Sequence, residues 1–317
     1  MSGGQARRPV RRFPPLPAIT DLVGRTPLVK IGLLASVPGV RILAKLEYFN
    51  PGGSVKDRAA LQMVLEAHAN RRLTAERTLI DSTSGNTGVA YSWIGAALGF
   101  RVALVMPANV SIARKRITGA YGAQLIYSDP MEGSDGAIRL VRQLVEKSPN
   151  SYFYPDQYSN EANPLAHYLS TGEEIWQQTG GEVTHLVCGI GTGGTVMGTG
   201  RRLREHRRDI RVIGVEPAEA LHGLEGLKHM PSSIVPAIYR EEELDEKISV
   251  STDEGWEMAD RLLAEEGLLV GRSAGAAMVG ALRVAQQIAS EGKRGTIVTV
   301  FPDRGDRYFE PRPLGDR

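Results

Sequence analysis

The stretch Asn50-Pro51-Gly52-Gly53-Ser54-Val55-Lys56-Asp57-Arg58 joins a predicted strand to a predicted helix. The strand is the apolar run 41–46, and the segment after the lysine has apolar residues at helical spacing. Taken by itself, this stretch fits a loop in which Ser54 caps the helix and Lys56 is exposed to solvent. Two further polar loops argue against that interpretation, because each also lies between a strand and a helix.

Outward from this stretch, short apolar strands alternate with helical segments. The predicted strands are 41–46, 78–81, 102–106, 124–127, 185–190, 211–215 and 296–301, and the predicted helices beyond the lysine helix are 86–98, 111–121, 136–147, 164–178, 195–206, 252–266 and 274–290. Such alternation is typical of α/β proteins with parallel sheets, whose ligands bind beyond the carboxyl ends of the strands. For 317 residues we predict two α/β lobes with open parallel sheets, helices on both faces of each sheet and an active site between the lobes.

Composition and charge exclude several classes of function. The 38 basic and 36 acidic residues nearly balance, so we expect no nucleic-acid partner. No apolar run has the roughly 20 residues of a membrane span, so we expect no membrane partner. The single cysteine, Cys188, excludes an intramolecular disulfide and leaves no cysteine cluster for a metal, which fits a reducing, cytoplasmic location. Residues 1–17, rich in Arg, Pro and Gly, are expected to form a disordered arm.

The loop Gly191-Thr192-Gly193-Gly194-Thr195 has the composition of an anion-binding loop. Its glycines let backbone N–H groups approach an anion, the following helix adds a favourable dipole, and the threonines add hydroxyl donors. No lysine follows as in a P-loop, and the glycine spacing differs from that of dinucleotide-binding loops. The loop therefore favours a terminal phosphate monoester. A tight glycine turn at a strand end is the structural alternative.

The loop Thr83-Ser84-Gly85-Asn86-Thr87-Gly88 likewise follows a strand and begins a helix. It offers N–H groups and hydroxyls to a carboxylate without a formal positive charge. As an isolated motif it fits a helix cap equally well. An amino acid bound beside a phosphorylated cofactor accounts for both loops and for Lys56 together.

Several further motifs occur in the same chain. The full set is Gly53 to Arg58, Thr83 to Gly88, Asp156 to Asn160, Thr171 to Trp176, Gly191 to Thr195, Gly271 to Gly275 and Asp303 to Tyr308. In this combination and order the chain resembles the β-family, or fold type II, of pyridoxal-phosphate enzymes, whose fold is like that of the tryptophan synthase β-subunit. Within it the chain is similar to the cysteine synthases and cystathionine β-synthases, and most similar to the cysteine synthase B group. The resemblance extends from about residue 19 to residue 308.

The resemblance implies a role for each motif. Lys56 is expected to bind pyridoxal 5′-phosphate covalently and, once displaced by the substrate, to remove its α-proton. Asn86 is expected to hydrogen-bond the ring hydroxyl of the cofactor and Ser273 to face its pyridine nitrogen. A hydroxyl does not keep that nitrogen protonated, so the ring is a weaker electron sink, which favours β-elimination over transamination. The expected phosphate-binding residues are Gly191, Thr192, Gly193, Gly194 and Thr195, and the expected substrate-binding residues are Thr83, Ser84, Gly85, Thr87, Gln157 and Lys228.

The implied activity is a β-replacement that makes L-cysteine from O-acetyl-L-serine, or O-phospho-L-serine, and sulfide or thiosulfate. The alternative is a cystathionine β-synthase-like condensation of serine with homocysteine. Residues 272–275 resemble the corresponding motif of cystathionine β-synthase, whereas the short segment 217–226 argues against this activity. Family members are usually homodimers, so we expect a homodimer that acts on small molecules. We expect a large cofactor-binding domain at 18–50 plus 151–317 and a smaller, mobile substrate domain at 51–150.

Three other residues have competing interpretations. Lys228 follows a glycine turn expected near the entrance of the site, where a cation would attract a charged leaving group or sulfur donor such as phosphate or thiosulfate. A solvated lysine beside the site is an equal alternative. His167 is interpreted as a structural helix residue, with a catalytic base as the minority interpretation. Cys188, in an apolar strand, is interpreted as a packed residue.

Overall fold

The computed structural model describes residues 18–83, 85–110 and 112–308. The arm predicted at 1–17 lies outside the described residues, and so does Ser84 of the predicted substrate loop. Among the residues that are described, no helix is both long and apolar enough to cross a membrane.

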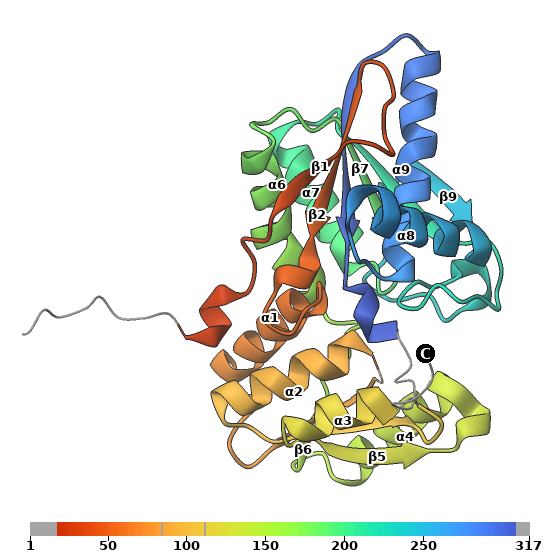
Figure 1. Cartoon of the computed structure of the whole chain (residues 1–317). Helices are drawn as coiled ribbons and strands as arrows, with labels where there is room; N and C mark the ends of the chain where they lie inside the picture. Colours follow the sequence, from red (N-terminus) through yellow and green to blue (C-terminus); the bar gives the residue numbers. More distant parts are fainter. Residues whose placement is uncertain (1–17, 84, 111, 309–317) are drawn as a thin grey trace, which may run out of the picture.

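The strands form two separate sheets (Figure 1). The larger sheet has the strand order β1 (Leu28–Ile31), β2 (Val40–Leu46), β10 (Gly295–Phe301), β7 (His185–Gly189), β8 (Arg211–Pro217) and β9 (Glu246–Val250). Only its β1–β2 pairing is antiparallel. The smaller sheet is parallel throughout, in the order β5 (Gln124–Ser128), β4 (Val102–Pro107), β3 (Thr78–Ser82) and β6 (Tyr152–Phe153). The predicted architecture of two α/β lobes with open parallel sheets is confirmed, and the antiparallel edge strand β1 is the one departure from it.

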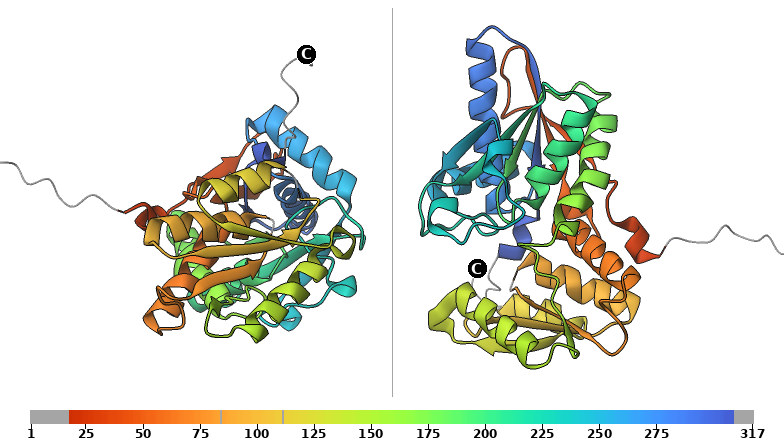
Figure 2. Two further views of the ribbon diagram at one scale, coloured as in Figure 1. Left: turned by 90° about the horizontal axis from the view of Figure 1, so that it is seen from below. Right: turned by 180° about the vertical axis from the view of Figure 1, so that it is seen from behind.

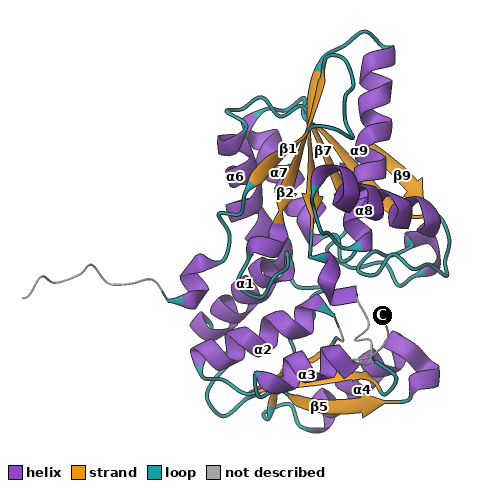
Figure 3. Cartoon of the chain, in the orientation of Figure 1, coloured by secondary structure: helices purple, strands orange, loops and turns teal. Residues whose placement is uncertain are grey.

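Helices cover both faces of each sheet (Figures 2 and 3). Their bounds are α1 (Lys56–Ala69), α2 (Asn86–Leu98), α3 (Ile112–Ala120), α4 (Gly133–Lys147), α5 (Ala162–Ala166), α6 (Gly172–Gln178), α7 (Gly194–His206), α8 (Thr252–Glu266) and α9 (Arg272–Ser290). The small sheet packs α1 and α2 on one face and α4 on the other. The large sheet packs α8 and α9 on one face and α6 and α7 on the other.

The apolar pattern of β4 shows why a parallel sheet needs both helical layers. Val102, Leu104 and Met106 belong to the core cluster beneath α1 and α2, whereas Ala103 and Val105 belong to the cluster beneath α4. Successive side chains of a strand point to opposite faces, so a continuous apolar run buries both of them.

Three strands and one helical irregularity were not predicted. The edge strands β1 and β9 each contain charged residues and are only partly buried, so neither has the apolar run that identified the central strands. Strand β6 is only two residues long. The predicted helix 164–178 contains a π-helical turn, His167–Thr171, between α5 and α6.

The domain boundaries stay a prediction, as does the mobility of the smaller domain. Strand β6, at residues 152–153, pairs within the small sheet.

Asp81, in β3, is a buried carboxyl with incomplete hydrogen bonding. Its Oδ1 atom accepts a hydrogen bond from the backbone N–H of Ser82 at 2.7 Å, whereas Oδ2 has no partner among the described residues. Burial raises the pKa of Asp81 to about 7. The carboxyl lies two residues before Thr83, so it supports the start of the predicted substrate loop.

This buried carboxyl predicts a pH dependence of stability. The folded chain keeps the Asp81 proton up to about pH 7, whereas an unfolded chain releases it near pH 4. The Asp81 contribution to the free energy of unfolding should therefore fall as pH rises from about 4 to 7. In Asp81→Asn the fall in the free energy of unfolding between pH 4 and pH 7 that is due to Asp81 should vanish. At pH 8 the free energy of unfolding of the variant should exceed that of the parent by at most about 4 kcal/mol.

Urea denaturation at pH 5 and pH 8 measures the effect. Asp209→Asn is the matched control because Asp209 is exposed. An unchanged pH dependence in Asp81→Asn would contradict the assignment.

Candidate active site

Lys56 is the first residue of α1, and it lines a cavity between the two sheets. The cavity, called here the lysine cavity, is lined by Val55, Lys56, Asn86, Cys188, Gly189, Gly191, Thr192, Gly193, Thr195, Glu225, Gly226, Leu227, Ser273, Val300, Pro302 and Asp303. Burial lowers the pKa of the Lys56 amine, and the nearby carboxyl of Asp303 opposes that shift. A desolvated amine of this kind can serve as a nucleophile and a base near neutral pH.

An adjoining cavity continues from the lysine cavity. Lys56, Asn86, Thr192 and Gly226 line both spaces. The adjoining cavity is also lined by Ser82, Thr83, Gly85, Thr87, Val105, Pro107, Ala137, Gln157 and Tyr158. The structure thus brings the lysine and both predicted anion-binding loops together, although they are far apart in the sequence.

The loop 191–195 connects β7 to the N-terminus of α7 with a backbone that requires glycine. A Cβ atom at Gly191 would lie 2.3 Å from the carbonyl oxygen of Gly226, and Gly193 has a φ of +89°. Gly191, Thr192, Gly193 and Thr195 line the lysine cavity beside the positive end of a 13-residue helix, a placement in which a loop can bind an anion. Gly194 does not line the cavity; its N–H contacts Thr192 Oγ1 at 3.3 Å.

The loop that starts at Thr83 has the same placement at the end of β3 and the start of α2. Gly85 occupies the position before the first helical residue. The hydroxyl of Thr87 donates to Gln157 Oε1 at 2.9 Å, so two residues predicted to bind the substrate are in direct contact. The described part of this loop faces the adjoining cavity, where it can bind a second anion.

Asn86 is held by residues near the end of the described chain, which sequence reasoning did not assign to the site. Its Nδ2 atom donates to Asp303 Oδ2 at 2.6 Å, and its Oδ1 atom accepts from Arg307. Tyr308 donates to the same Asp303 oxygen, and Arg307 also donates to the Gly52 carbonyl. Burial raises the pKa of Asp303. The motif 303–308 was visible in the sequence, but only as a family likeness.

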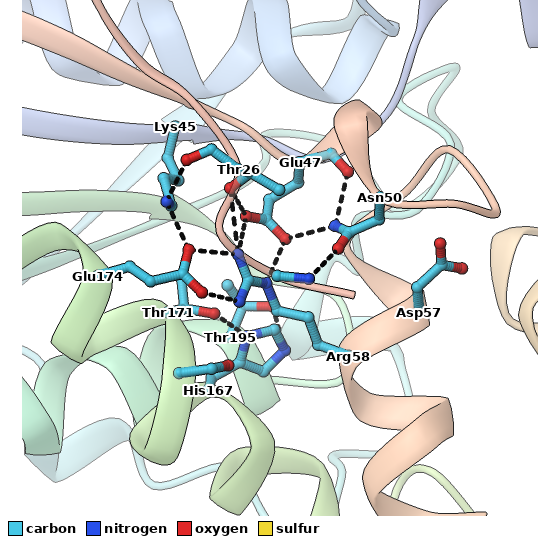
Figure 4. Close-up of polar contacts among 12 residues, drawn as sticks. Thr26, Lys45, Glu47, Asn50, Asp57, Arg58, His167, Thr171, Glu174 and Thr195 are labelled. Carbon is cyan, nitrogen blue, oxygen red and sulfur yellow. Dashed lines mark hydrogen bonds and ion pairs between the residues drawn. The ribbon is translucent and has the colours of Figure 1, made fainter. Parts of the chain in front are cut away.

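A buried ionic cluster anchors the first turn of α1 (Figure 4). Arg58 makes two hydrogen bonds of 2.7 Å to Glu47 and bonds of 2.6 and 2.8 Å to Glu174. Lys45 donates to Glu174 Oε2 at 2.6 Å. Burial by itself would raise the pKa of Glu47 and of Glu174, but the Arg58 cation outweighs it and lowers both, that of Glu174 to about 2. Both carboxyls are therefore ionised. Burial lowers the pKa of Lys45, and the neighbouring Glu174 carboxylate opposes that shift.

Asp57 closes the turn before Lys56. Its two oxygens accept from the backbone N–H of Gly52 at 2.5 Å and from Trp93 Nε1 at 3.0 Å. Burial raises the pKa of Asp57 to about 6. Trp93 thus donates a hydrogen bond to the lysine turn.

The remaining predicted residues occupy different positions relative to the cavities. Ser273, in the first turn of α9, is buried and lines the lysine cavity. Cys188 also lines it, and burial raises the pKa of its thiol to about 12, which fits a packed and unreactive residue. Lys228 lines neither cavity. Its Nζ atom lies 5.1 Å from the ring centre of Tyr158, and Tyr158 lines the adjoining cavity. Among the described residues no cluster of His, Cys, Asp and Glu could hold a metal ion.

Comparisons with known proteins agree with this geometry. Residues 19–303 match the family model described as pyridoxal-phosphate dependent enzyme. The chain is 52% identical over 302 residues to the cysteine synthase of Aquifex aeolicus, covering 94% of this chain and 92% of the relative. It is 39% identical over 301 residues to cysteine synthase B of Pseudomonas aeruginosa, covering 93% and 98%. A solved cysteine synthase of Entamoeba histolytica superposes with a TM-score of 0.87 at 36% identity, covering 98% and 96%. The chain therefore belongs to the family of pyridoxal-phosphate-dependent enzymes.

Proposed function

We propose that this protein is a cysteine synthase that makes L-cysteine from O-acetyl-L-serine, or O-phospho-L-serine, and sulfide. With thiosulfate as the sulfur donor the same β-replacement gives S-sulfocysteine, because the sulfonate stays on the added sulfur. The observation that carries the proposal is the meeting of Lys56 with two anion-binding loops in joined cavities. One loop suits the phosphate of a cofactor and the other the carboxylate of an amino acid. The names of the relatives support the same activity.

The residues of the lysine cavity fit pyridoxal phosphate. A Cβ atom at Gly191 would collide with the Gly226 carbonyl oxygen, and one at Gly193 would lie 3.1 Å from the Tyr239 side chain. These glycines therefore allow the loop to pack closely against its neighbours, and Gly191, Thr192, Gly193 and Thr195 line the cavity. We assign the phosphate to the loop 191–195, the ring hydroxyl to Asn86 and the ring nitrogen to Ser273. One amide proton of Asn86 bonds Asp303, which leaves the other for the hydroxyl.

When bound, the cofactor supplies an electron sink that makes the α-proton of an amino acid acidic. Lys56 is the base that takes this proton, because burial lowers the pKa of its amine. Its position at the first residue of α1 is fixed by the hydrogen bonds of Asp57 and Arg58. Ser273 places a neutral hydroxyl at the ring nitrogen, which favours loss of a β-substituent.

The substrate carboxylate is assigned to the adjoining cavity. Thr83, Gly85, Thr87 and Gln157 line that space, and Ser84 is retained from the sequence prediction. Their donors are neutral, so they orient the carboxylate without adding a competing cation near Lys56.

The assembly and the compartment remain part of the proposal. We propose a homodimer, as is usual in the family, with exposed apolar side chains such as Leu33 and Leu169 as available contact surface. A cytoplasmic location is supported by the single buried cysteine.

The lysine assignment predicts an optical signature and an activity. The purified protein should show a visible absorption band from the lysine-bound cofactor and should form cysteine from O-acetylserine and sulfide. Lys56→Ala should lose both, because no other described residue lining the lysine cavity has an amine side chain. Absorbance spectroscopy and a cysteine assay measure these outcomes, with Lys30→Ala, at an exposed position, as the control. Cystathionine formation from serine and homocysteine without any cysteine formation would refute the proposed activity.

Lys228 provides the proposed selectivity for charged substrates. Its backbone N–H donates to the carbonyl of Ile190 at 2.9 Å, which fixes the position of the residue beside the loop 191–195. Its side chain lies over Tyr158 at the wall of the adjoining cavity, and burial lowers the pKa of its amine. The negative charge of Asp135 opposes this shift of the Lys228 pKa, but no ion pair between Lys228 and a carboxylate is present among the described residues. The cation is thus available to a phosphate or thiosulfate group.

The prediction concerns the relative use of substrates. Lys228→Ala should lower kcat/KM for O-phosphoserine or thiosulfate by about 10- to 100-fold, the effect of one charge-assisted hydrogen bond. For the reaction of O-acetylserine with sulfide, kcat/KM should change by less than about threefold, because neither the acetyl group nor sulfide receives the charge-assisted hydrogen bond from Lys228. Lys228→Arg should retain the preference. Steady-state kinetics with each donor and acceptor give the answer, and an equal loss for all pairs would contradict the role.

A further inference from the structure

Two buried side chains that do not line the lysine cavity contact the threonines of the loop 191–195. Asn163 Nδ2 lies 3.0 Å from Thr192 Oγ1, and His167 Nε2 lies 3.3 Å from Thr195 Oγ1. Asn163 and His167 are 2% and 1% exposed, and neither lines the lysine cavity, whereas both threonines do. The threonines therefore separate these two side chains from any ligand in the cavity (Figure 4 shows His167 and Thr195).

Close packing of α7 against this segment makes both contacts possible. A Cβ atom at Gly194 would lie 2.0 Å from Asn163 Oδ1. A Cβ atom at Gly198 would lie 2.9 Å from the Cβ atom of His167 and 2.0 Å from the Pro164 carbonyl oxygen. Two glycines on one side of α7 thus allow the helix to approach Asn163 and His167, which lie four residues apart.

The hydrogen bonds of Thr192 determine where its proton points. Its oxygen accepts from Asn163 Nδ2 and from the backbone N–H of Gly194, at 3.0 and 3.3 Å. A hydroxyl has two acceptor lone pairs and one proton. The two hydrogen bonds occupy both lone pairs of the Thr192 oxygen. Its hydroxyl proton is therefore free to bond an acceptor in the cavity.

The position of the Thr195 proton depends on the tautomer of His167. Burial lowers the pKa of His167 to about 3, assisted by the Arg58 cation, so the ring is neutral and has one N–H. Nδ1 lies 2.8 Å from the hydroxyl oxygen of Thr171, a residue that is fully buried. With the proton on Nδ1, the Thr195 hydroxyl must donate to Nε2 and presents only lone pairs to the cavity. With the proton on Nε2, Thr171 donates to Nδ1, and the Thr195 proton is free to bond an anion.

We propose that Asn163 and His167 are positioning residues that direct the hydroxyl protons of Thr192 and Thr195 toward the cofactor phosphate, with Thr171 holding His167 in its Nε2–H tautomer. The inference rests on the proposed placement of the phosphate at the loop 191–195. Each hydrogen bond in the chain from Thr171 through His167 to Thr195 then runs in the same direction. No proton leaves its heavy atom, so the arrangement orients donors and performs no acid–base step.

The first test compares two amides at position 167. An amide at the end of Gln can place an N–H donor where Nε2 lies, whereas the shorter Asn reaches only the position of Nδ1. His167→Asn should weaken pyridoxal-phosphate binding by about tenfold, the effect of one mispositioned donor to a charged group, and His167→Gln should remain within about threefold of the parent. Reconstitution of the apoprotein, followed by fluorescence, gives the dissociation constants, and the ³¹P resonance of the bound cofactor reports the phosphate contacts.

The second test uses the far end of the chain of hydrogen bonds. Thr171→Val keeps the shape but removes the donor to Nδ1, so it should weaken cofactor binding and shift the ³¹P resonance although residue 171 does not reach the cavity. Thr171→Ser, which retains the hydroxyl, is the matched control. In a Thr195→Val background, neither His167→Asn nor Thr171→Val should cause a further loss, because the group that they orient is absent.

Nitrogen NMR of the ¹⁵N-histidine-labelled holoenzyme observes the tautomer directly, with His167→Gln assigning the resonance. A proton on Nε2 is expected. A proton on Nδ1, or unchanged cofactor affinity in both His167→Asn and Thr171→Val, would overturn the inference. Failure of the unsubstituted protein to bind pyridoxal phosphate would instead overturn the proposed cofactor placement, so the two outcomes are distinct.

Discussion

The ion pairs of the Arg58 guanidinium with Glu47 and Glu174 are the interactions on which the placement of Lys56, the proposed active-site lysine, depends. Removing these charges from water is costly, and the cost is offset only when each hydrogen bond has good geometry. The cluster therefore tolerates few orientations of α1 relative to β2 and α6. Because Lys56 is two residues before Arg58, a requirement on the buried cation becomes a requirement on the position of the amine proposed as the catalytic group.

The two anion-binding loops share a second constraint, which is the absence of formal charge on the groups they use. Each loop relies on helix N-termini, glycine backbone and hydroxyls. Lys56 is consequently the only cationic side chain among the described residues that line the two cavities. Its proton affinity is then set by burial and by Asp303, without interference from a phosphate-binding lysine or arginine. The groups that the two loops would offer to anions are dipoles without formal charge. Binding of a phosphate and a carboxylate is therefore compatible with a neutral amine on Lys56.

The sequence predicted the parts of the fold and site that depend on local pattern. Apolar runs located the central strands, and glycine and threonine at strand ends located both loops, because these signals lie within a few consecutive residues. The edge strands β1 and β9 were not predicted, since strands that are half exposed lack such a run. The partners of Asn86 and Arg58 were not predicted either. The Asn86–Asp303 and Arg58–Glu174 pairings join residues more than 100 positions apart, and a single sequence has no signal for which distant charge a buried side chain will meet.

The order of the strands also affects how the chain acquires its site. Strands β3 to β6 are consecutive in the sequence, so the small sheet can form from one continuous segment. In the large sheet, β2 lies between β1 and β10, and Val40 pairs with Gly295. During synthesis β2 must therefore wait for β10, which emerges from the ribosome much later. Asp303 follows β10 directly, so the residues that hold Asn86 arrive after every other wall of the lysine cavity has been made. With the cofactor placed as proposed, its binding is therefore a late event in synthesis, and β2 is the strand that remains longest without one of its partners and is most exposed to mispairing.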